Sequence, residues 1–371
     1  MVPSSSVFAL GSNGGNVAWN CVRSDAGWGV LKPLCQKIAL EDVVRFRRAL
    51  RTWFEREGRD YPWRQTRDPY RILVSEMMLQ QTQIATVLRR RFYERFLEAF
   101  PDLRSLAKAK DEVLLKAWEG LGYYRRVRML REAARKITKE HEGVFPRKYE
   151  EILALPGVGR YTAGAVASFA FNSPTPVVDG NVARVLSRLM DFPEEIDRGP
   201  AQKQLWSWAG ELVDPSHARI FNSALMEVGQ TCCRPGVPDC LSCPISRFCL
   251  TSTPEDLPRK TKRAKPIEVE ERAVYARDGG KVLLCRQEEG RRVGMWRLPL
   301  REVDPAWPLV YQCKYGITKY RVTLKVHRAP EGVQAGVGEV WHAVKDLQDR
   351  VIPPTDRRAL AALLESDEEI S

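Results

Sequence analysis

The sequence predicts an α+β protein made of an all-α domain followed by a small α+β domain. Apolar residues recur at helical spacing from Leu40 to about Ser246, and strand signals are scarce in that stretch. After Val269 the pattern changes to short alternating or apolar runs, and one further helical run lies near 356–364. A chain of 371 residues is long enough to build a separate hydrophobic core for each part.

The same changes in pattern divide the chain into four segments. The first is rich in serine and glycine without a sustained period, which predicts a flexible N-terminal extension. Between the two domains the chain is basic and proline-containing without apolar periodicity, as in a linker that lies near phosphate. The predicted segments are the extension 1–38, the helical domain 39–250, the linker 251–268 and the small domain 269–371. Strands are predicted in the small domain at 272–276, 281–285, 320–326 and 338–344.

The composition limits the classes of function open to the chain. The formal net charge of +12 suits a polyanionic partner such as nucleic acid. No apolar run is long enough to span a bilayer, and the N-terminus lacks the pattern of a secretory signal. We therefore expect no membrane association, and we expect a monomer in the cytoplasm, associated with the nucleoid.

Four of the nine cysteines are packed into one short segment. Cys233, Cys240, Cys243 and Cys249 have the spacing C-x6-C-x2-C-x5-C, and thiolates this close in sequence can converge on one metal centre. Ligation by thiolates alone suits zinc or an iron–sulfur cluster, and the spacing by itself leaves both open. Cys232 is adjacent to a ligand position and is not needed as a ligand.

A glycine-containing turn, residues 155–160 (LPGVGR), lies between two helical runs. Gly157 and Gly159 let the chain reverse tightly, and the helix that follows begins with unpaired backbone N–H groups. Such a turn binds a phosphate without reading the base sequence. A plain connector between helices can have the same residues, so the turn alone leaves both interpretations open.

Two carboxylates lie in contrasting surroundings. Glu76 is part of an otherwise apolar helical run, where burial would raise its pKa. Asp179 precedes another helical run, where a helix N-cap is an equally good interpretation. Such a pair can divide into an acid and an anion, as glycosidic cleavage through a positively charged sugar requires. Aromatic residues within 61–64 and 120–124 fit either the core or loops that insert into a base stack.

Taken together, these segments resemble the MutY family of adenine DNA glycosylases and, more broadly, the endonuclease III superfamily. The resemblance covers about residues 40–250, and each motif occurs in the family's order and spacing. The segments that carry it are 61–64 (YPWR), 75–82 (SEMMLQQT), 118–124 (WEGLGYY), 155–165, 178–182 (VDGNV), 221–222 (FN) and the four cysteines.

The resemblance implies a helix-hairpin-helix fold beside a [4Fe–4S] module, with double-stranded DNA held between them. It implies that Glu76 protonates the adenine ring as a leaving group and that Asp179 stabilises the positive sugar. Tyr161 and Asn181 would support the same site. Because Tyr161 stands where bifunctional relatives carry a lysine, no Schiff base can form, and we expect little or no strand cleavage.

The resemblance also implies contacts with the DNA and the excised base. The implied base-pocket residues are Trp63, Arg64, Leu121 and Glu227. Two further residues, Gln81 and Tyr123, resemble the wedges that fill the gap left by the flipped base. The implied phosphate contacts of the hairpin are Gly157, Val158 and Gly159.

The small domain resembles the Nudix-like module of the same family, which inspects 8-oxoguanine opposite adenine. The segment 295–299 (MWRLP) and Trp341 carry this resemblance. The loop that reads Phe-Ser-His in the family aligns with Ile317, Thr318 and Lys319, so Thr318 and Lys319 are the expected DNA contacts. The chain leading to this loop is too short for the usual helix, and no glutamate-rich hydrolase box is present. We expect a shortened module without nucleotide hydrolysis.

From the resemblance we expect an enzyme that removes adenine mispaired with 8-oxoguanine or guanine from double-stranded DNA. Two alternatives remain open. A glycosylase for another base, such as thymine opposite guanine, would differ at the base pocket, where Tyr61 replaces the leucine of many adenine-specific members. A non-catalytic iron–sulfur protein that binds DNA would have little need for both Glu76 and Asp179.

Overall fold

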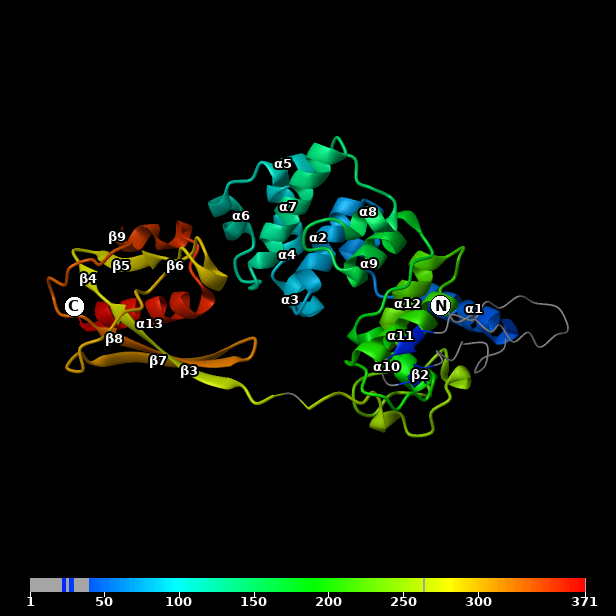
Figure 1. Ribbon diagram of the computed structural model, residues 1–371. Coiled ribbons are helices and arrows are strands. Elements are labelled where there is room, and N and C mark those ends of the chain that lie inside the picture. Colours follow the sequence, from blue (N-terminus) through cyan, green and yellow to red (C-terminus); the bar gives the residue numbers. More distant parts are fainter. Residues whose placement is uncertain (1–21, 25–26, 30–39, 263, 371) are drawn as a thin grey trace, which may run out of the picture.

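A computed structural model describes residues 22–24, 27–29, 40–262 and 264–370. A helical part is followed by a part with strands, which confirms the predicted α+β class (Figure 1). Most of the predicted N-terminal extension lies outside the described residues. Two short strands within it, β1 (Val22–Ser24) and β2 (Gly27–Gly29), pair with each other although no strand was predicted there.

The helical part contains twelve α-helices among the residues that the structure describes, and two hydrophobic cores. The first core is built mainly from α2 to α9, and the second from α1, α10, α11 and α12. The helices are α1 (Leu40–Glu57), α2 (Pro69–Leu79), α3 (Ile84–Arg89), α4 (Phe92–Ala99), α5 (Leu103–Ala107), α6 (Asp111–Ala117), α7 (Arg125–Glu140), α8 (Tyr149–Leu153), α9 (Arg160–Phe171), α10 (Gly180–Leu189), α11 (Gly199–Leu212) and α12 (Ala218–Thr231). Short 3-10 helices lie at η2 (Pro62–Arg64), η3 (Ser246–Phe248) and η4 (Pro254–Asp256).

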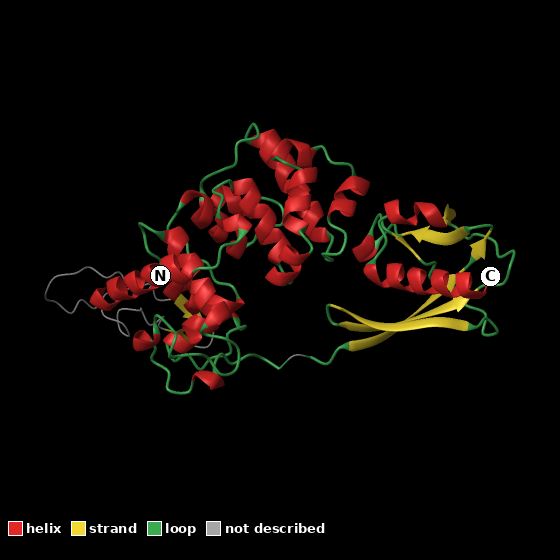
Figure 2. Ribbon diagram, turned by 180° about the vertical axis from the view of Figure 1, so that it is seen from behind, coloured by secondary structure: helices red, strands yellow, loops and turns green. Residues whose placement is uncertain are grey.

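The C-terminal part consists of two sheets and a long helix (Figure 2). One sheet has the order β3-β8-β7, with β3 parallel to β8 and β7 antiparallel to it. In the other sheet β5 pairs with β4, β6 and β9. The elements are β3 (Ile267–Tyr275), β4 (Arg277–Asp278), β5 (Lys281–Arg286), β6 (Trp296–Arg297), β7 (Leu309–Ile317), β8 (Tyr320–Arg328), β9 (Glu339–Ala343), η5 (Gly290–Arg292), η6 (Val344–Asp349) and α13 (Pro354–Ile370).

Two differences from the predicted organisation concern the long sheet. The nine-residue strand β7 was not predicted, because it carries Lys314 and Gly316 and alternates between half-buried and exposed residues without a strongly apolar face. Strand β3 begins at Ile267, inside the predicted linker, and its first residue pairs with Tyr320 of β8. Pairing with β8 therefore makes the end of the predicted linker a strand, although the sequence of that segment has no apolar periodicity.

The first half of the linker is attached to the helical part. The backbone N–H of Ile196 donates to the carbonyl of Arg259 at 2.9 Å, and the N–H of Thr261 donates to Asp197 at 3.0 Å. The guanidinium of Arg188 donates to the carbonyl of Leu257 at 2.9 Å. Ordered contacts thus continue well past the last helix of the helical part.

The C-terminal part also packs directly against the helical part, near α6 and α7. Met295, which is fully buried, and Val351 belong to the first helical core. Beside them, Arg357 Nη2 lies 2.6 Å from the carboxylate of Glu119, and Lys116 donates to the carbonyl of Gln348 at 2.5 Å. Apolar burial and a charged pair therefore join the two parts at a second place, distant in sequence from the linker (Figure 1).

None of the described helices has the length and apolar character needed to cross a membrane.

Candidate active site

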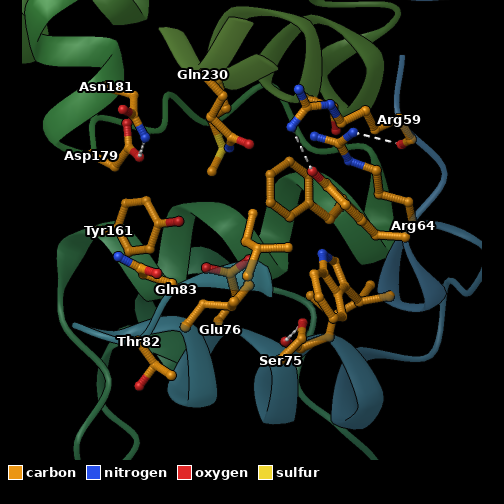
Figure 3. Close-up of a pocket in the computed structure, with 18 of the residues that line it drawn as sticks. Arg59, Arg64, Ser75, Glu76, Thr82, Gln83, Tyr161, Asp179, Asn181 and Gln230 are labelled. Atoms are coloured by element: carbon orange, nitrogen blue, oxygen red, sulfur yellow. Dashed lines mark hydrogen bonds between the residues drawn. The ribbon is translucent and has the colours of Figure 1, made fainter. Parts of the chain in front are cut away.

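A cavity of about 620 Å³ lies between the two helical cores. Its walls come from η2, α2 and the residues after it on one side, and from α9, the start of α10 and α12 on the other (Figure 3). Glu76, Tyr161, Asp179 and Asn181 all line it, so residues predicted from separate motifs meet in one place. The cavity is the candidate active site.

Glu76 reaches the cavity from the middle of α2. Asp68 caps the start of this helix through the N–H of Tyr70, and Pro69 occupies its first position, where a missing N–H has no cost. The Glu76 side chain is 5% exposed, and burial raises its pKa from 4.5 to about 7, against the opposing effect of a hydrogen bond with Tyr161. Near neutral pH this carboxyl group can therefore hold a proton that an exposed glutamate would release.

Asp179 faces the same cavity but has more donors. As the N-cap of α10 it accepts a hydrogen bond from the N–H of Val182 at 2.7 Å and one from the amide of Asn181 at 2.9 Å. Burial raises its pKa, and these donors oppose the rise by stabilising the anion. The N-cap interpretation and the site interpretation are thus both correct for Asp179, because one oxygen caps the helix while the group lines the cavity.

Tyr161 lies between the two carboxyl groups (Figure 3). It projects from the first turn of α9, and burial together with the nearby Glu76 raises the pKa of its phenol. The tyrosine therefore stays protonated at any ordinary pH and acts as a hydrogen-bond donor. Asn181 is oriented in turn by Arg184, whose guanidinium donates to its carbonyl oxygen at 2.9 Å.

Close packing of α12 against α10 holds Asn181 in place. A Cβ on Gly229 would lie 2.7 Å from the Cβ of Asn181, so no larger residue fits at this crossing. The same face of α12 contributes cavity residues that the sequence analysis did not single out. They recur at helical spacing, which was the available signal: Arg219, Ser223, Met226 and Gln230.

The predicted base-pocket residues separate into two groups. Trp63 and Arg64 line the cavity, and the Trp63 ring stacks on Tyr61 with centroids 5.3 Å apart. Glu227 is fully buried behind Arg64, whose Nη1 lies 2.8 Å from its Oε2 in an ion pair that lacks the alignment of a hydrogen bond. Leu121 lies in the first helical core and not on the cavity wall.

Neither Leu121 nor Glu227 is among the described residues that line the cavity, and their base-pocket role stays a prediction. Leu121 packs into the core because the loop before α7 turns its side chain inward, where it is 6% exposed. Glu227 acts on the cavity only through Arg64, which it shares with a second cation, since Arg59 Nε lies 3.4 Å from its other oxygen.

The two predicted wedge residues lie in loops next to the cavity. Gln81 follows α2 with φ 59°, and Tyr123 precedes α7 with φ 47°. The Tyr123 side chain is 48% exposed, which is unusual for a large aromatic group. Left-handed backbone at a non-glycine residue costs free energy and is concentrated at functional sites.

The predicted hairpin connects α8 to α9. Gly157 has φ 74°, and a Cβ there would lie 2.4 Å from Met129, so both its backbone and its surroundings require glycine. Gly159 is the N-cap of α9, and Val158 N–H donates to the carbonyl of Leu155 at 3.1 Å. The twelve-residue helix α9 thus begins with free N–H groups directly after a tight turn, as phosphate binding requires.

The four clustered cysteines line a second cavity of about 320 Å³. The side chain of Arg188 donates to Cys233 Sγ at 3.3 Å and to the carbonyls of Arg234 and Gly236 at 2.8 Å each, which holds the cysteine loop against α10. Among the described residues, no three His, Cys, Asp or Glu side chains are arranged to hold a single metal ion. Burial raises the pKa of Cys243 to about 12.

Thr318 and Lys319 form the turn between β7 and β8. Thr318 has φ 51°, and the Lys319 ammonium lies 5.4 Å from the Tyr320 ring centre. The carbonyl of Lys319 accepts a hydrogen bond from Ile267 at 2.8 Å, so the turn lies beside the end of the linker. Both residues are thus at the tip of a hairpin, at the end of the long sheet where the linker enters β3 (Figure 1).

Two helical cores with a glycine hairpin and paired carboxyl groups at their boundary define a helix-hairpin-helix class of DNA repair protein. Residues 74–211 match the model of the HhH-GPD superfamily base excision DNA repair proteins. A solved structure of a thermostable thymine-DNA glycosylase is similar with a TM-score of 0.51 and 31% identity, over 57% of this chain and 96% of that one.

Curated relatives narrow the class further. A rat adenine DNA glycosylase is 39% identical over 81% of this chain and 60% of its own length, and a human one is 46% identical over 56% and 39%. A Buchnera aphidicola adenine DNA glycosylase is 31% identical over 63% of this chain and 67% of its own length. The chain belongs to this HhH-GPD family, which confirms the resemblance recognised in the sequence. It spans about 60% of the rat relative and less of the human one.

Proposed function

We propose that the protein is an adenine DNA glycosylase that hydrolyses the N-glycosidic bond of adenine mispaired with guanine or 8-oxoguanine in double-stranded DNA. The observation that carries the proposal is that two carboxyl groups with different surroundings line the same cavity. Burial raises the pKa of Glu76 to about 7, whereas the rise that burial causes in the pKa of Asp179 is opposed by hydrogen bonds from Val182 and Asn181, which favour its anion. A poor leaving group and a cationic sugar need this combination.

In the proposed reaction, Glu76 gives its proton to the ring of the flipped adenine while the bond between N9 and C1′ breaks. The electron pair of that bond leaves with the base, and Asp179 stabilises the positive charge on the sugar. Water then adds to C1′, and the ionised Glu76 accepts its proton. The products are free adenine and an abasic site, and the enzyme regains its starting state.

We further propose that the reaction stops at the abasic site. By the family resemblance Tyr161 stands where bifunctional relatives carry a lysine, and a phenol on the cavity wall cannot form an imine. Borohydride added during the reaction should therefore capture no enzyme on the DNA. Efficient covalent capture would contradict a monofunctional enzyme.

The four clustered cysteines fit a [4Fe–4S] cluster. All four line one cavity, and ligation by four thiolates is the donor set that such a cluster takes. Cys233, Cys240, Cys243 and Cys249 would hold it, and Arg188 would donate to the Cys233 sulfur. The cluster would order the loop that follows α12. Protein purified without air should contain about four irons per chain; stoichiometric zinc without visible absorption would contradict this.

A second candidate is supported by the thymine-DNA glycosylase similarity and by Tyr61, whose ring stacks on the cavity residue Trp63. Duplexes carrying A:8-oxoG, A:G, T:G and U:G should be incubated with the protein and assayed for abasic sites. Excision of adenine alone supports the main proposal. Excision of thymine or uracil with adenine left in place favours the second candidate.

A further inference from the structure

Two strained loops, the first of which continues into the cavity wall at Thr82, converge on one buried arginine. The first loop follows α2 and carries Gln81, and the second precedes α7 and carries Tyr123, both with left-handed backbone. Such conformations persist only where the surrounding structure holds them. Arg126, in the first turn of α7, is 8% exposed and contacts both loops.

One end of the Arg126 guanidinium holds the end of α2. Its Nη1 donates to the carbonyls of Met77 at 2.8 Å, Met78 at 2.9 Å and Gln80 at 2.5 Å. The last carbonyls of a helix have no partner within that helix, so a side chain from another helix caps α2 here. Because Glu76 is adjacent to Met77, the same contacts fix the turn that presents the proposed acid.

The other end of the guanidinium holds the second loop. Nη2 donates to the carbonyls of Leu121 at 3.0 Å and Gly122 at 3.2 Å. The Tyr123 ring lies 5.6 Å from the guanidinium carbon, within the range of a cation–π contact. Burial lowers the pKa of Arg126 to about 10, so the group still carries its charge at neutral pH.

We propose that Arg126 is a positioning residue that joins these two loops, so that Gln81 and Tyr123 hold the target base outside the duplex while Glu76 faces it. The inference rests on the proposed glycosylase function. A planar guanidinium can donate to both loops at once, whereas the single ammonium of lysine cannot span them. Arg126→Lys therefore keeps the charge and removes the connection.

Arg131→Lys is a matched control. Arg131 lies on the same helix, is 7% exposed, and donates to the carbonyl of Ala109 at 3.1 Å beside an ion pair with Asp111. It contacts neither loop, so its replacement tests the cost of losing a buried guanidinium in α7 without touching the cavity.

The experiment measures single-turnover excision of adenine and, on the same duplex with 2-aminopurine at the target position, the fluorescence rise as that base leaves the stack. Arg126→Lys should excise about 10²-fold more slowly, the loss expected from a small misplacement of reacting groups, and should lose the fluorescence rise. Arg131→Lys should keep both. Equal behaviour of the two variants in both measurements would overturn the inference.

Failure of the variant to fold and failure of the proposed function can each be distinguished from failure of the inference. If Arg126→Lys does not fold, Thr82→Val removes only an acceptor that lies 3.4 Å from Arg126 Nη2, and it should show a smaller loss in both measurements; unchanged values would contradict the inference. If the wild-type protein excises no adenine, the proposed function fails. The role of Arg126 is then decided by the fluorescence alone.

Discussion

The cavity at Glu76 and the turn at Thr318 and Lys319 would face the two members of one base pair, and they are built very differently. In the cavity, the proposed catalytic groups contact one another: the buried Glu76 bonds to Tyr161, and the half-buried Asp179 accepts a hydrogen bond from Asn181. The turn ends a hairpin and carries a threonine hydroxyl and a flexible lysine ammonium. The first region has fixed geometry for chemistry, whereas the second offers little for distinguishing one purine from another.

The largest expected effect tests the chemical side of this comparison. Glu76→Gln keeps the shape of the side chain but cannot deliver a proton to the leaving base. Excision should fall by at least ~10²–10⁴-fold while affinity for the duplex is retained. Single-turnover rates and a binding titration measure the two quantities. Wild-type excision by this variant would remove Glu76 from the mechanism.

The next largest effect is expected from Glu227, the buried carboxylate behind Arg64. Glu227→Gln leaves Arg64 and Arg59 without their shared anion, and breaking a buried pair costs ~3–5 kcal/mol of unfolding free energy. Excision should fall as well, because Arg64 lines the cavity. Glu98→Gln is the control, since its ion pair with Arg91 is exposed and should contribute ~0–1 kcal/mol. Denaturant unfolding of both variants checks this difference.

A dependence on pH should follow from the raised pKa of Glu76. The acid must be protonated, so the wild-type rate should fall as pH rises above about 7, by roughly tenfold per unit at high pH. Stability should change in the same direction. The folded state binds the proton more tightly than the unfolded state, so unfolding free energy is lost between pH 4.5 and about 7.

The sign of this stability effect can be checked with the same Gln variant. At pH 8 Glu76→Gln should be more stable than the wild type by roughly 3 kcal/mol, because it removes a buried carboxylate, and the gain should vanish near pH 4. Thermal or denaturant unfolding at the two pH values is the measurement. An equal difference at both values would show that Glu76 titrates normally.

The smallest expected effect concerns the turn at Thr318 and Lys319. The preference for A:8-oxoG over A:G should lie within about tenfold, or roughly 1.4 kcal/mol. Lys319→Ala should weaken binding of both duplexes alike, because an ammonium serves phosphate better than one oxidised base. Single-turnover rates and binding constants on both duplexes measure this. A preference of several hundredfold that Lys319→Ala or Thr318→Ala abolishes would show that the turn recognises the lesion.

Much of the helical part was predictable because its signals are local. Helical periodicity predicted the class of fold, and the turn with Gly157 and Gly159 lies where the sequence placed it, between α8 and α9. The apolar run around Glu76 identified a helix whose residues do line the cavity. The strand β7 was missed because its residues acquire a strand partner only in the folded chain.

The sequence by itself determined which chemical groups the chain has and the local structures that present them: an acid in an apolar helix, a carboxylate at a helix start, a hairpin and four spaced cysteines. Only the tertiary structure decided that Leu121 points into the core, that Glu227 lies behind Arg64, and that Arg126 joins two loops. Periodicity and turn chemistry act over a few residues, whereas these contacts join segments that are distant in sequence and depend on how helices pack.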